Sequence, residues 1–212
     1  MARRKKEPKS VHREKIASAA SVLFMERGIA ATSMDDIAKA AGYSKATLYV
    51  YFENKEEIVG ILALDSMKKL YHYIASALEQ QQTTKEQYNF ICRGLVQYQE
   101  EFPFYFKMVL DKINIDFERH DYLPEEKETY QIGEEINEKI KEFLISGIDK
   151  GDLRSDLKIM PTVFGFWGML SGLIQLADNK EEYIKKAMGL SKAQFLEHGF
   201  HMLYCSIADS GE

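Results

Sequence analysis

The stretch that decides the fold is SMDDIAKAAGYSKATLYVYFENK, residues 33–55. It holds two apolar repeats at helical spacing, each about eight residues long, which the pair Gly42-Tyr43 separates. Ser33 and Ser44 precede the two repeats, and serine is a favoured residue at helix N-termini. The pattern therefore predicts a helix-turn-helix, with Gly42 in a tight turn that needs a positive φ.

Two helices of this length are not stable alone in water, so a third helix must pack beneath them. The preceding segment 10–27 supplies an apolar stripe at helical spacing, and Gly28 fits its C-terminal cap. We therefore expect a three-helix bundle, followed by a long helix that Asn54 caps and that runs to about Gln80. The stripe consists of Ile16, Ala19, Ala20, Leu23 and Phe24.

The second helix of the pair has an outer face suited to the major groove of DNA. Leu48 and Phe52 point to the core, which places small and hydroxyl side chains on the opposite arc and two tyrosines on its flanks. Such side chains can bond base edges or phosphates, and a helix N-terminus favours a phosphate. The alternative is an ordinary helical hairpin whose tyrosines cover the core. The candidate contacts are Ser44, Lys45, Thr47, Tyr49, Tyr51 and, opening the next helix, Lys55.

Charge is distributed unevenly along the 212 residues, whose net charge is −5. Residues 1–55 carry a net +5 and the remainder −10, so a basic head that meets a polyanion is one interpretation. Chance clustering in the basic run 3–6 is the other. With 45% hydrophobic residues the chain can build a core, and two distant cysteines suggest a reducing cytoplasm.

The rest of the chain is helical in pattern, without convincing alternating strands, so the predicted fold class is all-α with about nine helices. We expect Thr84 with Gln87 to begin the fifth helix, an aromatic segment 102–117 that Pro103 breaks, and a loop at 118–127. The other predicted helices are 84–101, 128–149, 161–177 and 191–207.

The string from Thr32 to Ile58 resembles the DNA-binding signature of TetR-family transcriptional regulators, and the likeness extends back through residues 16–28. The resemblance implies a homodimeric repressor that places one recognition helix per subunit in a near-palindromic operator. It implies a basic arm at 1–10, a DNA-binding domain at 11–58 and a ligand-binding and dimerisation domain at 59–212. The helix-turn-helix within it would span 33–52. The implied DNA contacts are Ser33, Ser44, Lys45, Thr47, Tyr49, Tyr51 and Lys55.

Three residues depart from the pattern of the family it resembles. Ala46 stands where the family often has Gly or Pro, and Val50 stands where an aromatic residue or His is common. Tyr43 replaces the usual small aliphatic residue of the turn. These departures predict a missing phosphate contact at Val50 and altered packing or an added contact at Tyr43.

The body is rich in aromatic residues, and core packing alone explains such a set. The resemblance favours an apolar pocket for a small effector, which would shift the long fourth helix and release the operator. The effector is unidentified and expected to be apolar or aromatic. The predicted pocket residues are Phe102, Tyr105, Phe106, Phe143, Phe164 and Trp167.

Residues 159–177 contain no charge, which is more than one helix of a small monomer can bury. We expect this segment to pair with the last helix in a homodimer. The alternative is a helical interaction protein or a regulator anchored in a membrane, against which Pro161, Ser171 and Gln175 argue. The predicted interface residues are Gly168, Gly172, Phe195, Phe200 and Leu203.

No nucleophile or phosphate-loop motif is present in the sequence, so we do not expect an enzyme. His198 and His201 are spaced i, i+3 beside Glu197, but a polar helix face explains them better than a metal. We expect no metal, no cofactor, no membrane partner and a cytoplasmic location.

Overall fold

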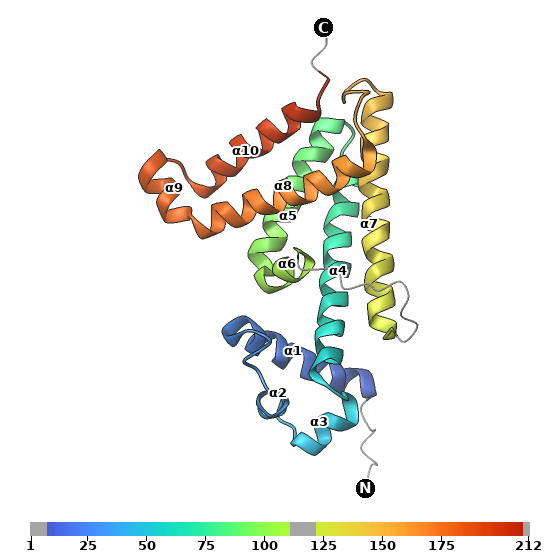
Figure 1. The fold of residues 1–212 in the computed structure, drawn as a ribbon, viewed down its shortest axis with the longest axis vertical. Helices are drawn as coiled ribbons and strands as arrows, with labels where there is room; N and C mark the ends of the chain where they lie inside the picture. Colours follow the sequence, from blue (N-terminus) through green and yellow to red (C-terminus); the bar gives the residue numbers. More distant parts are fainter. Residues whose placement is uncertain (1–7, 111–121, 210–212) are drawn as a thin grey trace. The chain divides into compact units, whose positions relative to one another are not determined.

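A computed structural model describes residues 8–110 and 122–209, and this part of the chain forms ten α-helices (Figure 1). They fall into two compact units. The first contains α1–α3, α4 up to Met67, most of α6, and α7 up to Tyr130, and the second contains the remaining helical residues. The helices are α1 Lys9–Arg27, α2 Met34–Ala41, α3 Lys45–Tyr51, α4 Lys55–Gln80, α5 Thr84–Glu101, α6 Pro103–Leu110, α7 Pro124–Asp149, α8 Ile159–Asn179, α9 Glu181–Met188 and α10 Lys192–Ile207.

The all-α prediction is confirmed, and among the described residues the only extended pairing is an isolated bridge between Leu153 and Ala208. The structure has one helix more than the nine expected. The addition is α9, a short polar helix in which only Ile184 is buried, and Gly189 ends it in the left-handed conformation. Its apolar residues stand at helical spacing, but a segment of eight residues is too short for that spacing to be distinctive.

Several helix starts differ from the prediction by a few residues. Thr83, one residue before the expected cap, begins α5 with a capping box to Glu86. Pro103 does not break a helix but is the first residue of α6, and Pro124 opens α7 inside the expected loop at 118–127. Proline is favoured at the first helical position because its missing N–H has no partner there in any case. Of the predicted arm 1–10, residues 1–7 lie outside the described part, and Lys9 already belongs to α1.

The core of the first unit is built from side chains of α1, α2, α3 and the start of α4. The stripe of α1 is buried, with Ile16 and Ala20 fully enclosed, and α2 adds Ile37. From α3 come Leu48 and, at its C-terminal end, Phe52, which are also enclosed. This core supplies the packing that such short helices need for stability.

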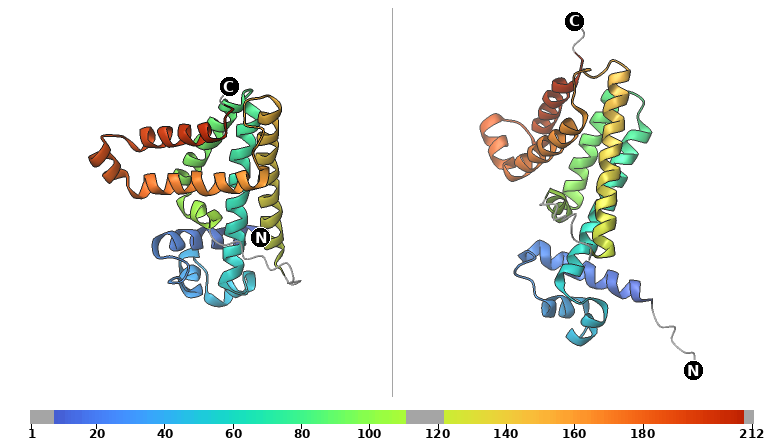
Figure 2. Two further views of the ribbon diagram at one scale, coloured as in Figure 1. Left: turned by 45° about the horizontal axis from the view of Figure 1, so that its top comes forward. Right: turned by 45° about the vertical axis from the view of Figure 1, so that its right-hand side comes forward.

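The second unit packs α8 and α10 side by side and both against α5, with α9 between the ends of the pair (Figure 2). Gly199 of α10 allows the close crossing, because a Cβ there would lie 2.5 Å from Leu173 Cδ2. The buried Tyr88 of α5 donates from its hydroxyl to the Phe200 carbonyl at 2.8 Å. Burial raises the pKa of the nearby Cys92 thiol to about 12, so this cysteine stays protonated.

Candidate nucleic-acid interface

The turn between α2 and α3 has the geometry that the glycine predicts. Gly42 adopts the left-handed conformation with φ of 77°, and its N–H donates to the Ala38 and Lys39 carbonyls. The N–H of Tyr43 also reaches the Ala38 carbonyl, at 2.8 Å. These bonds end α2 within one residue and redirect the chain into α3, so the angle between the two helices is fixed by backbone contacts.

Capping side chains fix where α2 begins. Ser33 Oγ accepts from the Asp36 N–H, and the Asp36 carboxylate accepts from the Ser33 N–H and hydroxyl. These hydrogen bonds hold the pKa of Asp36 below its usual value. Ser33 thus caps α2, as its place before the first apolar repeat predicts, and its side chain is engaged in this cap at the exposed start of the helix.

A second cap fixes the start of α3. Ser44 Oγ accepts from the Thr47 N–H at 3.1 Å, and the two hydroxyls of these residues lie 2.8 Å apart. Lys45, the first residue of α3, pairs with Asp35 of α2 at 3.2 Å while its side chain remains largely exposed. The N-terminus of α3 thus presents two hydroxyls and an ammonium at one place.

The middle of α3 presents its outer face to solvent. Tyr49 is 46% exposed and Val50 66% exposed, while the preceding residue, Leu48, is fully buried. Ala46, the second residue of α3, is also exposed. The structure therefore brings Ser44, Lys45, Thr47 and Tyr49 together on an accessible face, with the small Ala46 allowing close approach.

Two of the predicted contacts face the protein instead. The Tyr51 ring stacks 5.0 Å from the His12 ring, and the His12 Nδ1 lies 2.7 Å from the Tyr43 hydroxyl. The Lys55 ammonium donates to the Ile29 carbonyl at 2.6 Å and to the Thr32 carbonyl at 2.9 Å. Tyr51 thus packs against another ring, and Lys55 donates hydrogen bonds to backbone carbonyls. The position of these residues in their helices does not indicate either contact.

The sequence analysis missed Arg13 and His12, which connect α1 to α3. Arg13 donates to the Tyr51 carbonyl at 2.6 Å, and the departure at Tyr43 proves to be a partner of His12. Their only sequence signal is that an arginine follows a histidine at the start of α1, beside the apolar stripe. Such a signal does not distinguish a buried donor from a solvated one.

The predicted pocket residues are not gathered in one place. Phe143 and Trp167 meet in the second unit at an apolar cavity of about 30 Å³. Tyr105 and Phe106 belong to the first unit, where Tyr105 packs against the core under α1–α3. A cavity this small holds only one or two waters, so an effector would have to open it.

The other two pocket candidates lie outside this cavity. Phe102 packs against Tyr98 with ring centroids 5.8 Å apart, and Phe164 is 57% exposed on α8. Aromatic character alone predicted both as lining residues, and it does not tell a core, a cavity and a surface apart. The described cavity is lined by Tyr88, Ile91, Leu95, Ile140, Phe143, Leu144, Val163, Phe166, Trp167 and Leu170.

The α8–α10 pair leaves an apolar face open. Gly168 and Gly172 are exposed, and a Cβ at either would meet nothing within 4 Å. Phe195 and Leu203 are half-buried, whereas Phe200 is buried inside its own chain. Large apolar side chains on the open face of α8 include Met160, Phe164, Met169 and Leu176.

By length and composition α8 could cross a membrane, but its other face belongs to the core of the unit. Val163 and Ile174 are fully enclosed there, and Leu170 is buried between them. One face of α8 is therefore buried in the core of the unit, from Val163 to Ala177, and the other face is exposed. The described residues also contain no group of three or more side chains placed to hold a metal ion.

Taken together, α1–α3 form a helix-turn-helix domain of the DNA-binding type, with α3 as its exposed second helix. Residues 16–60 match the family model described as "Bacterial regulatory proteins, tetR family". Residues 16–60 therefore form a DNA-binding domain of the tetR family of bacterial regulatory proteins.

Individual relatives agree with this assignment. The regulator TtgR of Pseudomonas putida is 40% identical over 79 residues, which span 37% of each chain. The transcriptional repressor KstR2 of Rhodococcus jostii is 28% identical over 162 residues, 71% of this chain and 72% of that protein. The crystal structure of PfmR from Thermus thermophilus has a TM-score of 0.67 at 24% identity, covering 90% of this chain and 97% of PfmR.

The geometry of Lys55 yields a stability prediction. Lys55→Met keeps the stem but leaves the Ile29 and Thr32 carbonyls without their donor, which should lower the free energy of unfolding by about 1–3 kcal/mol. Urea denaturation measures it, with the exposed Lys39→Met as the charge-matched control. Equal stability of the two variants would show that the Lys55 ammonium is free to leave these carbonyls.

Proposed function

We propose that the protein is a homodimeric transcriptional repressor that reads a near-palindromic operator with α3 of each subunit. The observation that carries this proposal is the accessible face of α3, where Tyr49 is exposed directly beside the buried Leu48. Residues 11–58 then act as the DNA-binding domain, and the protein works in the cytoplasm, where operator DNA lies. Repression is supported by the names of relatives, which include a KstR2 repressor and the IcaR negative regulator of Staphylococcus epidermidis.

The chemistry of the α3 face supports reading in the major groove. Lys45 and the Ser44 hydroxyl at the helix N-terminus suit a phosphate, because backbone N–H groups and the helix dipole favour an anion there. Thr47 and Tyr49, three and five residues after Ser44, suit base edges and the thymine methyl. Phosphate contacts at Ser33, Tyr51 and Lys55 remain part of the proposal, each requiring the side chain to add to or exchange its present partner.

Dimerisation is proposed through the open face of α8 together with α10. Exposed Phe164, Met169 and Leu176 form an apolar surface on α8 that is costly to leave in water. Gly168 and Gly172 on the same face allow another helix to approach closely. A second copy of the chain presents the same surface, so a symmetric pairing buries both.

The effector is proposed to be a small apolar or aromatic molecule that opens the cavity at Phe143 and Trp167. Binding there would favour a conformer in which α4 has shifted and the two α3 helices no longer lie about 34–36 Å apart. A structure of similar fold, that of AibR, is described in complex with isovaleryl coenzyme A and operator DNA.

Operator reading is tested by Thr47→Ala and Tyr49→Ala. Each should weaken binding to a selected operator by about 1–3 kcal/mol and change affinity for random duplexes little, because base contacts carry the discrimination. The cap of α3 survives in Thr47→Ala because Ser44 accepts from the backbone N–H.

Fluorescence anisotropy at several salt concentrations measures both affinities. Tyr183→Ala, which removes an exposed tyrosine from α9, is the matched control. Folded variants that bind the operator like this control would remove α3 from the interface.

Dimerisation is tested by Phe164→Glu. A carboxylate on the open face of α8 should shift the protein to monomer in sedimentation and lower operator affinity by at least about tenfold, because the two half-sites no longer bind as a unit. Ile145→Glu places the same charge at an exposed apolar position of α7 and should remain dimeric. A wild-type protein that is monomeric at micromolar concentration contradicts the proposal.

A further inference from the structure

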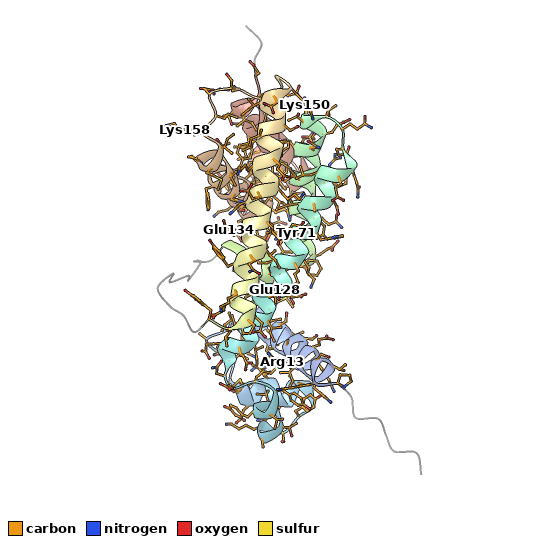
Figure 3. All side chains as sticks on the ribbon, turned by 90° about the vertical axis from the view of Figure 1, so that its right-hand side faces the viewer. Arg13, Tyr71, Glu128, Glu134, Lys150 and Lys158 are labelled. Carbon is orange, nitrogen blue, oxygen red and sulfur yellow. The ribbon has the colours of Figure 1, made fainter. Side chains whose placement is uncertain are left out.

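Arg13 of α1 holds together parts of the first unit that are far apart in the sequence. Its Nη1 donates to the Tyr51 carbonyl at 2.6 Å and lies 3.1 Å from Glu57 Oε1. Its Nη2 lies 3.2 Å from Glu125 Oε1, and its guanidinium carbon lies 4.3 Å from the centre of the Phe52 ring. Figure 3 labels Arg13 on α1 and, near the N-terminal end of α7, Glu128.

We infer that Arg13 is a positioning residue for the recognition helix, and that its ion pair with Glu125 makes this position depend on α7. The inference rests on the proposed function insofar as α3 is the helix that reads DNA. Tyr51 is the last residue of α3. Its carbonyl is one of the last four of the helix, which have no intrahelical N–H as a partner. A cation there completes the helix end and complements its dipole.

The shortness of α3 makes this end decisive. The helix has seven residues, with a Ser44 cap at its start and the Arg13 contact at its end. Between these two points only Leu48 of α3 is buried. The direction in which Tyr49 points is therefore fixed by two polar anchors and one core side chain, and loosening either anchor lets the helix rotate.

The two carboxylates around Arg13 have different roles. Glu57 is held by its own helix start, because its Oε2 accepts from the Glu53 N–H at 2.7 Å and its N–H donates to Asn54 Oδ1 at 2.8 Å. Glu125 comes from the first turn of α7 and accepts from Nη2, the second terminal nitrogen of the Arg13 guanidinium. Arginine can satisfy both carboxylates and the carbonyl at once, which the single ammonium of lysine cannot do in the same geometry.

This arrangement makes α7 a candidate for transmitting a signal. The same helix that carries Glu125 also carries Ile140, Phe143 and Leu144, which line the cavity in the second unit. A displacement of α7 along its axis changes the distance from Glu125 to Arg13. A longer distance would loosen the C-terminal end of α3 within one subunit. This effect differs from the change in distance between the two α3 helices that is proposed above for the effector.

The inference is tested with Glu125→Gln and with Glu134→Gln as its control, since both remove one negative charge from α7 and Glu134 is exposed (Figure 3). Hydrogen exchange of the protein without DNA should be about tenfold faster at the amides of α3, above all at Phe52, in Glu125→Gln only. Exchange in α3 equal to that of the control overturns the inference, whether or not the protein binds DNA.

Operator binding gives a second readout whose direction is diagnostic. Removing a negative charge favours DNA binding by simple electrostatics, so Glu134→Gln should bind equally or slightly more tightly. Glu125→Gln should instead lose about tenfold in operator affinity while its affinity for random duplexes matches the control. Equal losses for operator and random DNA would indicate general destabilisation and overturn a positioning role.

A double-mutant cycle that combines Glu125→Gln with Arg13→Lys tests whether the change in α3 exchange comes from the Arg13–Glu125 ion pair. If Glu125 acts through Arg13, its substitution should change α3 exchange much less in the Arg13→Lys background. An undiminished effect would mean that Glu125 acts by another route. If the wild-type protein binds no duplex at all, the proposed function fails, and the exchange comparison still decides the positioning role.

Discussion

The structure depends on the burial of Leu48 and Phe52 against α1. A helix of seven residues gains too little from its own hydrogen bonds to persist in water, so its existence depends on these two side chains. The Ser44 cap and the Arg13 contact then add to them in fixing its orientation. Because Leu48 and Phe52 lie on one face, the opposite face with Ala46 and Val50 is exposed, and Tyr49 lies on its flank. The same contact thus creates the helix and decides which residues can reach a partner.

Local signals in the sequence predicted this part of the molecule well. The Ser33–Asp36 capping box, the Ser44 cap and the left-handed Gly42 depend on neighbouring residues, so the sequence contains the information needed to predict them. The side chains of Tyr51 and Lys55 were harder, because their partners His12, Ile29 and Thr32 come from other segments. Arg13 escaped notice for the same reason, since the residues that bind it come from α3, α4 and α7.

The body was predictable as a class but not in detail. The uncharged run 159–177 correctly indicated one long apolar helix, and the structure divides it into a core face and an open face. Composition could not distinguish cavity, core and surface among the aromatic residues, so Phe143 and Trp167 meet at a cavity while Phe164 faces solvent. The start of α7 at Pro124 carries too few apolar residues for periodicity to reveal it, and α9, although amphipathic, has only eight residues.

The central claim is that two copies of α3 read a duplex together, and selection of bound duplexes from random DNA by the purified protein tests it most directly. The account predicts enrichment of two inverted half-sites whose centres lie about one helical turn, or a whole number of turns, apart. Recovery of sequences with no repeated half-site, or no enrichment over the starting pool at physiological salt, would contradict it.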